Sequence, residues 1–390
     1  MLDELRSDPG LAAKSPGDIA ALFQARFGSA PRLFQAPGRI NIIGEHTDYC
    51  GGLVMPAAID RRCTVAAAAN GGRGLTVVAG VFGEEASADL DALAPSGGWM
   101  DYVAGVASVL TAAGVAVPGA DLWIESDVPI GAGVSSSAAI EVAVAHALLA
   151  LAGREADGVQ IAKWAQAAEN SFVGMPCGIM DQYASANGVE GAALMVDCGT
   201  LACTPVALPD TASFLLIDSM VGHAHVEGAY RDRREDCETA ARILGVKLLA
   251  EVSEADLADA LPRLPPNPAK RCRHVVTDTA RVRRAAQALE RGDLAALGAL
   301  MNLSHASLRD DMEVSAPQVD QLAAIAQATP GVLGARMMGG GFGGCVIALV
   351  GAGDAERAQT AIQDRFGAAI GQRPGAFVCR AVAGAGEVRL

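Results

Sequence analysis

A segment rich in glycine and serine is the part of the sequence best suited to chemistry. Residues 127–139 read DVPIGAGVSSSAA and join a predicted strand, 121–128, to a predicted alanine-rich helix, 137–151. Glycines let backbone N–H groups approach an anion closely, and a helix N-terminus adds unpaired donors with positive potential. The segment therefore predicts a phosphate-binding loop; the alternative interpretation is a serine-capped helix without further function.

Two common nucleotide-binding loops are excluded by the residues of this segment. A Walker A loop would need Gly-Lys-Ser or Gly-Lys-Thr, and residues 127–139 contain no lysine. A dinucleotide-binding fingerprint would have a third glycine at the position of Ser136. With no lysine nearby, backbone donors and Mg²⁺ would have to neutralise the charge of a bound phosphate.

A second segment places four polar side chains between two apolar strands. Residues 36–52 read APGRINIIGEHTDYCGG and contain Arg39, Glu45, His46 and Asp48. Carboxylates and an imidazole can each accept or donate a directed hydrogen bond, so such a cluster is suited to binding several hydroxyls of a sugar. A solvated turn with a structural histidine is an equally good interpretation of the composition alone.

Two further segments could contribute to the same site. In residues 169–182, ENSFVGMPCGIMDQ, one helix ends at a Gly/Pro break and another begins. Glu169 could reach a metal ion, and Asp181 lies in the first turn of the second helix, where the helix dipole favours a negative charge. Asp181 could equally be no more than an ordinary residue of a helix start. The loop 337–345, MMGGGFGGC, is either a wall of the site or a bulged hairpin.

Composition and charge limit the class of protein. Thirty basic and forty-four acidic residues give a net charge of −14, so the average surface repels nucleic acid and anionic lipid. The N-terminus lacks the pattern of a secretory signal, no apolar run reaches the roughly 20 residues that span a membrane, and nine cysteines without a C-x-x-C pair indicate reduced thiols. We expect a cytoplasmic protein that binds small molecules; the number of subunits stays open, and a monomer is compatible with the sequence.

The elements that must position these residues fall into two groups. The first half alternates short strands with turn residues and then becomes helical, with predicted strands at 32–36, 40–43, 53–59, 63–69 and 75–79 and helices at 102–113, 137–151 and 160–173. The second half follows a split βαβ order, with strands at 214–218, 332–338, 345–350 and 376–382. We expect an α+β protein with an N-terminal mixed-sheet domain, residues 1–195, and a ferredoxin-like C-terminal domain, residues 196–390.

Six segments of the chain, in order, resemble the galactokinase family within the GHMP sugar kinases. They are PGRINIIGEHTDY, VPIGAGVSSSAAIE, VGMPCGIMDQ, EGAYRDRREDCE, SHASLRDDMEVSAPQVDQL and RMMGGGFGGC. They extend over nearly the whole chain, and chance agreement at six ordered places is negligible. The resemblance implies the two-domain GHMP kinase fold. It also implies ATP-dependent, Mg²⁺-assisted transfer of the γ-phosphate to the C1 hydroxyl of galactose, giving α-galactose 1-phosphate.

The resemblance also implies roles for individual residues. It makes Asp181 the group that takes the proton from the anomeric hydroxyl or orients it, with Arg39 beside it. The sugar hydroxyls would be bound by Glu45, His46, Asp48, Gly178 and Tyr230. Trp99 would flank the adenine, and the ATP phosphates would contact Gly131, Ala132, Gly133, Val134, Ser135, Ser136 and Ser137. Ser137 and Glu169 would hold Mg²⁺.

Two positions depart from the family's pattern. Cys50 stands where many galactokinases have asparagine, and there the segment resembles the N-acetylgalactosamine kinase branch. Gly222 stands where several members have a basic residue before His223. We therefore rank galactose first as the acceptor and another hexose or an amino sugar such as N-acetylgalactosamine second.

Two other functions have less support in the sequence. A non-catalytic sensor of sugar and ATP would not need the complete set of serine loop, Arg39, Glu169 and Asp181. A mevalonate or homoserine kinase would share the phosphate loop, but its acceptor offers fewer hydroxyls than the cluster from Glu45 to Asp48 can bind.

Overall fold

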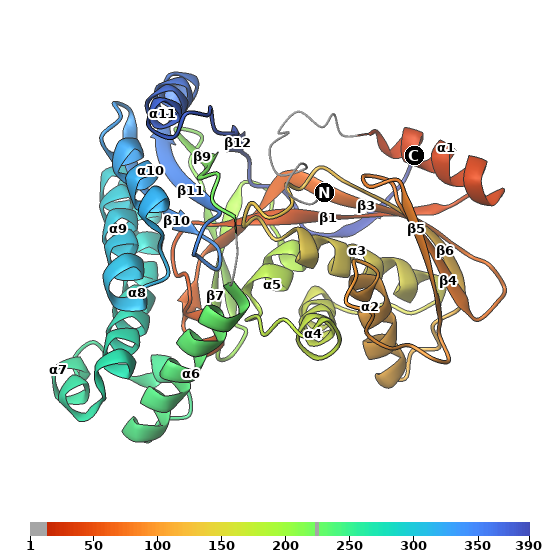
Figure 1. Ribbon diagram of the computed structural model, residues 1–390, viewed down its shortest axis with the longest axis horizontal. Coiled ribbons are helices and arrows are strands. Elements are labelled where there is room, and N and C mark those ends of the chain that lie inside the picture. The colour runs from red at the N-terminus through yellow and green to blue at the C-terminus, as the bar shows by residue number, and fades with distance from the viewer. Residues whose placement is uncertain (1–13, 223–225) are drawn as a thin grey trace.

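A six-stranded sheet organises the N-terminal half of the chain. The computed structural model describes residues 14–222 and 226–390 (Figure 1). In spatial order the strands are β13 (Gly386–Val388), β1 (Arg32–Asn41), β3 (Pro56–Ala69), β6 (Ala120–Ser126), β4 (Gly74–Ala79) and β5 (Glu84–Asp89). Neighbouring strands are antiparallel except β4 and β6, which are parallel. β1 is buried along most of its length, as expected of a strand with helices on both faces.

Helices cover both faces of this sheet (Figure 1). One face carries α1 (Pro16–Phe27), which begins at a capping box on Ser15 and ends at Gly28 in the left-handed conformation. The other face carries α2 (Asp101–Ala112), α3 (Ser136–Leu151), α4 (Gly158–Ala168) and α5 (Met180–Asn187). α3 contacts both β1 and β3 as well as the other three helices, because it is apolar on nearly all sides. Within the described residues, no helix combines the length and the apolar character needed to cross a membrane.

A bulge interrupts β1 without ending it. The pairing with β3 shifts between Pro37, which lies opposite Arg62, and Arg39, which lies opposite Ala58. The sequence predicts two strands here, 32–36 and 40–43, and this is wrong because a bulge allows a proline, which has no N–H, to remain within a sheet. The break predicted between 59 and 63 is also absent, since β3 runs continuously from Pro56 to Ala69.

The C-terminal half is built on a second, four-stranded antiparallel sheet. Its spatial order is β10 (Val332–Met338), β11 (Cys345–Gly351), β9 (Ala212–Asp218) and β12 (Ala376–Cys379). This is the order that a split βαβ unit gives, so the ferredoxin-like prediction is confirmed. The helices of this half are α6 (Val226–Leu244), α7 (Leu257–Ala260), α8 (Pro266–Glu290), α9 (Leu294–Ser307), α10 (Pro317–Gln327) and α11 (Ala355–Ile370).

The chain passes between the two halves more than once. A small sheet of β2 (Leu53–Val54), β7 (Ala192–Asp197) and β8 (Cys203–Ala207) includes strands from both sides of the predicted boundary at 195/196, which lies within β7. Near the C-terminus, β13 returns to pair with β1 in the N-terminal sheet. The assignment of residues 1–195 and 196–390 to separate domains stays a prediction.

The contact between α9 and β10 depends on two glycines. A Cβ added at Gly298 would lie 2.1 Å from the carbonyl oxygen of Leu333, and one at Gly334 would lie 2.2 Å from that of Gly298. We expect Gly298→Ala to lower the free energy of unfolding by about 2 kcal/mol or more, because the obstructing atoms belong to the backbone. Gly228→Ala is the matched control, since its added Cβ meets no atom within 4 Å. Urea denaturation compares the two variants, and equal midpoints would contradict the prediction.

Candidate active site

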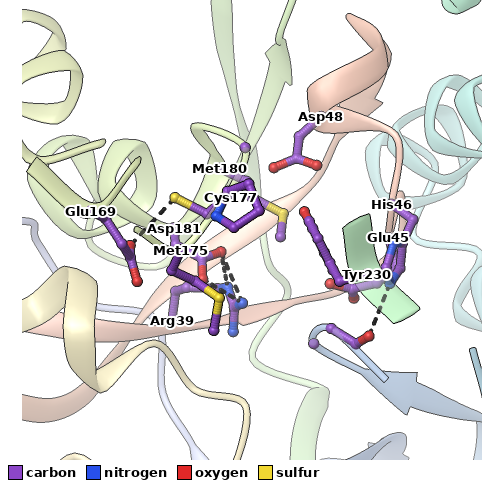
Figure 2. Close-up of a pocket in the computed structure, with 14 residues that line it drawn as sticks. Arg39, Glu45, His46, Asp48, Glu169, Met175, Cys177, Met180, Asp181 and Tyr230 are labelled. Atoms are coloured by element: carbon purple, nitrogen blue, oxygen red, sulfur yellow. Dashed lines mark hydrogen bonds and ion pairs between the residues drawn. The ribbon is translucent and has the colours of Figure 1, made fainter. Parts of the chain in front are cut away.

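A cavity of about 190 Å³ lies where β1, α5, α6 and the loop after β10 meet (Figure 2). Eight of the predicted site residues line it: Arg39, Glu45, His46, Asp48, Glu169, Gly178, Asp181 and Tyr230. The remaining lining residues are Met175, Pro176, Cys177, Met180, Gly339 and Gly340. The structure thus brings together residues from four separate sequence segments. One of them is the loop 337–345, which contributes Gly339 and Gly340, so this loop is a wall of the site.

An ion pair between Arg39 and Asp181 forms the floor of this cavity. Arg39 Nε and Nη2 donate to the two carboxylate oxygens of Asp181 at 2.9 Å each, which is a bidentate arrangement. Arg39 projects from the bulge in β1, and Asp181 lies in the first turn of α5. The arginine side chain is 4% exposed and the aspartate side chain 28%, so the cation is enclosed while the carboxylate faces the cavity.

The predicted phosphate loop adjoins this ion pair. Gly131, Gly133 and Ser135 have φ of 71°, 73° and 62°, and such an alternation of left-handed residues turns successive N–H groups toward one side, as in an anion-binding nest. The Ser135 hydroxyl donates to Asp181, and the carbonyl of Gly133 accepts from Arg39. A Cβ on Gly38 would lie 2.7 Å from the carbonyl oxygen of Val134, so this glycine allows the loop to lie directly against β1.

The two predicted metal ligands lie side by side. Glu169 begins a π-helical turn, Glu169–Val173, that continues α4, where the sequence predicts an ordinary helix to residue 173. The hydroxyl of Ser137 hydrogen-bonds to its carboxylate. Burial and the nearby charge of Asp181 raise the pKa of Glu169 to about 7. The ionised carboxylate is thus disfavoured here, and a bound cation would stabilise it.

This pair fits a metal ion that arrives with a phosphate. Across the described part of the chain, no three His, Cys, Asp or Glu side chains gather into a metal-binding group. Mg²⁺ does not require such a group, because it commonly takes one or two protein oxygens and completes its octahedron with phosphate oxygens and water. A hydroxyl and a carboxylate beside a phosphate loop are therefore a suitable set of donors.

Glu45 lies on the opposite side of the cavity and is almost fully buried. Its Oε2 accepts hydrogen bonds from Arg336 Nη2 at 2.8 Å and Asn41 Nδ2 at 3.1 Å. The backbone carbonyl of Glu45 accepts from Nε2 of His274 at 2.9 Å. Both the carboxylate and the backbone of Glu45 are thus held by neighbouring residues.

His46 lines the cavity as a neutral ring. Its Nε2 lies 3.2 Å from the carbonyl oxygen of Gly340, which can only accept, so Nε2 carries the proton and Nδ1 accepts from the Tyr49 hydroxyl at 3.0 Å. Burial lowers the pKa of His46 to about 3. The centroid of this ring lies 5.2 Å from that of Tyr230, and both rings also contact the ring of Tyr49. Direct sugar binding by His46 and Tyr230 stays a prediction.

Asp48 is a half-buried carboxylate at the far end of the cavity. Burial, with smaller contributions from Asp181 and Glu45, raises its pKa to about 6, although backbone N–H groups partly offset the effect. A Cβ on Gly178 would lie 1.7 Å from Oδ2 of Asp48, so any other residue at 178 would displace this carboxylate from its observed position. Asp48 and Gly178 therefore form one unit of the cavity wall.

Three residues that the sequence analysis singled out lie elsewhere. Trp99 is not among the cavity-lining residues; its Nε1 donates to Glu84 at 2.8 Å, and its contact with adenine stays a prediction. Cys50, 3% exposed, packs in the C-terminal hydrophobic core and does not line the cavity. Gly222 lies in a loop with its carbonyl oxygen 3.2 Å from the position of a Cβ on Gly343, and His223 is outside the described residues.

Sequence reasoning missed several polar residues around the site. Gln182 Nε2 donates to Glu169 and, at 3.1 Å, to the fully buried Glu141. Arg336 is likewise fully buried beside Glu45. All three stand within the six segments that resemble the family, and a charged or amide residue in an otherwise apolar run is the signal that could have identified them.

Three family models match the chain in order. Residues 21–69 match the galactokinase galactose-binding signature, residues 101–189 the N-terminal domain of GHMP kinases, and residues 285–368 the C-terminal domain of GHMP kinases. The first matched range holds four of the cavity's polar residues, Arg39, Glu45, His46 and Asp48.

Related proteins of similar length share much of the sequence. A galactokinase of Roseiflexus sp. (strain RS-1) is 42% identical over 95% of this chain and 97% of its own, and one of Chloroflexus aurantiacus is 42% identical over 94% and 96%. Among solved structures, Lactococcus lactis galactokinase complexed with galactose superposes with a TM-score of 0.92 at 31% identity, covering 95% of this chain and 99% of that one. Methanococcus jannaschii mevalonate kinase, 17% identical with a TM-score of 0.65 over 91% and 99%, shares the fold.

The raised pKa of Asp48 predicts that this residue lowers stability at neutral pH. Its pKa in the folded state, about 6, exceeds the ordinary value of 3.8, so the folded state binds more protons between these values and loses stability as pH rises through them. Asp48→Asn should therefore raise the free energy of unfolding at pH 8 by about 1 kcal/mol, after allowance for partial exposure.

Thermal unfolding at pH 8 and pH 5 checks this prediction. The gain of Asp48→Asn should shrink at pH 5, because the wild-type carboxyl is then largely protonated in the folded state. Asp210→Asn, at an exposed position, is the control and should show no such gain. A lower melting temperature for Asp48→Asn at pH 8 would contradict the interpretation.

Proposed function

The chain belongs to the galactokinase family of GHMP kinases, and on this premise we propose that it transfers the γ-phosphate of ATP to the C1 hydroxyl of galactose. The product would be α-galactose 1-phosphate. The observation that carries the proposal is the place of the Arg39–Asp181 ion pair between the phosphate loop and the polar end of the cavity. A hydroxyl bound against Asp181 would lie beside the loop that receives the phosphates.

Asp181 has the surroundings of a group that receives a proton or fixes a hydroxyl by its charge. Two donors of Arg39 and one of Ser135 hold it, and a carboxylate has about four lone-pair sites, so one remains for the sugar. The guanidinium also places positive charge beside the transferring phosphoryl group. Alignment and charge compensation by these residues can supply most of the acceleration, since phosphoryl transfer involves little covalent work by the protein.

The hydroxyl-binding side of the cavity supports a sugar as the acceptor. The Glu45 carboxylate, and separately the half-buried Asp48 with the adjoining backbone of Gly178, offer acceptors and donors to a ligand in a small cavity. A site built to satisfy several hydroxyls strongly rejects analogues that lack them, because its buried polar groups would remain unpaired. This arrangement favours a hexose over an acceptor with few hydroxyls.

Ser137 and Glu169 would hold Mg²⁺ with the ATP phosphates. When bound, the ion would neutralise phosphate charge that no lysine of the loop can neutralise. Gln182 donates to Glu169 and also to Glu141, and its bond to Glu169 helps to fix the direction of that carboxylate. All nine cysteines are free thiols, which fits the cytoplasm as the location that we propose.

Phosphorus NMR of the reaction mixture tests the proposed function. With ATP, Mg²⁺ and a panel of galactose, glucose, N-acetylgalactosamine, arabinose and mevalonate, we expect galactose to give the highest kcat/KM and a resonance of an α-1-phosphate. The absence of any sugar phosphate, or a phosphate on C6, would overturn the assignment. Preferred use of N-acetylgalactosamine would keep the reaction and change the acceptor.

Asp181→Asn should nearly abolish turnover and leave the binding of sugar and ATP largely intact. The change removes a proton acceptor and a charge but little volume, and loss of such a group typically lowers kcat about 10²- to 10⁴-fold. Because Arg39 is then buried without its anion, the variant should also unfold at a lower temperature. Calorimetric titration with galactose and with ATP, beside the rate assay, checks both parts. Turnover close to wild type would exclude this role for Asp181.

A further inference from the structure

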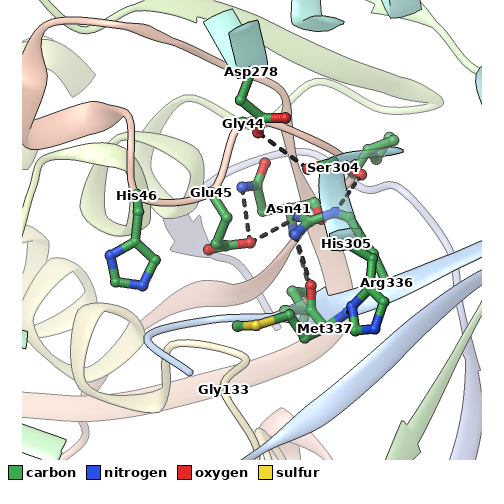
Figure 3. A network of polar contacts seen from close by, with 12 residues as sticks. Asn41, Gly44, Glu45, His46, Gly133, Asp278, Ser304, His305, Arg336 and Met337 are labelled. Atoms are coloured by element: carbon green, nitrogen blue, oxygen red, sulfur yellow. Dashed lines mark hydrogen bonds and ion pairs between the residues drawn. The ribbon is translucent and has the colours of Figure 1, made fainter. Parts of the chain in front are cut away.

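Arg336 is a fully buried arginine that does not line the cavity. It stands in β10, and each of its guanidinium nitrogens donates a hydrogen bond (Figure 3). Nε donates to the carbonyl of Ile42 at 2.9 Å, Nη1 to that of Met337 at 2.7 Å, and Nη2 to that of Asn41 at 2.6 Å and to the carboxylate of Glu45 at 2.8 Å. A strand of the C-terminal sheet thereby holds the end of β1 and the start of the segment that follows it.

The contacts of Arg336 leave one oxygen of Glu45 for a ligand. Arg336 and Asn41 both donate to Oε2, and these are the hydrogen bonds that the described structure gives the Glu45 side chain. Glu45 itself is 2% exposed and lines the cavity. A buried carboxylate that lacks a cation is strongly disfavoured, so Arg336 makes a charged acceptor possible at this point.

We propose that Arg336 is a positioning residue for the acceptor sugar, acting through Glu45. Arg336 fixes the carboxylate of Glu45 by saturating Oε2, so that Oε1 is presented to a sugar hydroxyl in one orientation. This inference rests on the proposed function, in which Glu45 binds the sugar. The guanidinium makes no contact with the sugar and acts on its binding by holding the group that does.

The fork of the guanidinium is essential to this role. Lysine would keep the charge, but its single nitrogen cannot reach the carbonyls of residues 41, 42 and 337 and the Glu45 carboxylate from one position. Arg336→Lys is therefore expected to keep the fold in part and to lose the fixed orientation of Glu45. The ATP phosphates would be bound by the loop 131–137, so the substitution should weaken the binding of the sugar and leave the binding of ATP nearly unchanged.

A double-mutant cycle between Arg336→Lys and Glu45→Gln tests the proposal. We expect Arg336→Lys to raise the KM for galactose roughly ten- to a hundredfold, the effect of losing a hydrogen bond to a charged group, with the KM for ATP changed less than about twofold. If Arg336 acts through Glu45, the same substitution in the Glu45→Gln background should raise the galactose KM by less than about threefold. If the galactose KM of the double variant rises by the product of the two single-variant factors, the two residues act independently and the proposal is overturned.

Arg271→Lys is the matched control. Arg271 is also almost fully buried in the C-terminal half and pairs with Asp236 and Glu313, yet it is not among the residues that line the cavity. This variant should lose a similar amount of thermal stability and keep the galactose KM of the wild type. An equal rise of the galactose KM in both variants would show a general structural effect and overturn the proposal.

A second variant keeps the test decisive if Arg336→Lys does not fold. Asn41→Ala removes the other donor to Oε2 of Glu45 and should raise the galactose KM in the same direction, by a smaller factor. Unchanged galactose binding in a folded Asn41→Ala variant, measured by calorimetry, would then count against the proposal. The wild-type enzyme in the same assay reports separately on the proposed function, since its failure to phosphorylate galactose would leave no sugar KM to compare.

Discussion

The ion pair between Arg39 and Asp181 is the constraint around which the site is built. It joins residues 142 positions apart, one on a strand and one at a helix start, and it leaves the carboxylate as the accessible member. A pair whose cation is this enclosed gains little net stability, because the cost of removing charge from water offsets the attraction. Its value is geometric. The bulge in β1 aims Arg39, the absence of a side chain at Gly38 lets the phosphate loop lie on β1, and Ser135 completes the set of donors around Asp181.

Carboxylates are crowded around the cavity, which Asp48, Glu169 and Asp181 all line. Asp48 and Glu169 both have raised pKa values, with burial as the first cause and Asp181 as a second. In a chain whose net charge is −14, ATP cannot be attracted by the overall field, so local donors and a cation must do so. This crowding of carboxylates lowers stability, but it also favours ligands: a metal ion can neutralise the charge, and a sugar hydroxyl can donate a hydrogen bond to a carboxylate oxygen. Function and stability are therefore opposed at these residues.

The sequence predicts the site better than it predicts the strands. Glu45, Asp48 and Asp181 have unusual polarity for their surroundings, which marks them in the sequence as candidate site residues, and all three line one cavity. The sequence predicts a strand break at residues 37–39, where the structure has a bulge, because local sequence does not reveal the partner strand that keeps Pro37 in the sheet. Cys50 shows another limit: it follows Asp48 by only two residues, and local sequence does not decide between the pocket and the core, where tertiary packing places it. Partners of buried charges, such as Arg336 beside Glu45, require knowledge of contacts between distant segments.

The pairing of β13 with β1 affects how the protein is made. Glu387 lies within this pairing, opposite Phe34, and forms an ion pair with Arg32, which precedes it by 355 residues in the chain. At a translation rate of about 5 to 20 residues per second, the edge of β1 emerges from the ribosome roughly 20 to 70 seconds before the strand that covers it. During that interval the nascent chain exposes an unpaired sheet edge, the kind of surface that recruits other strands or a chaperone. Synthesis of residues 14–195 alone does not complete this sheet, because its edge strand β13 is made only after the C-terminal half.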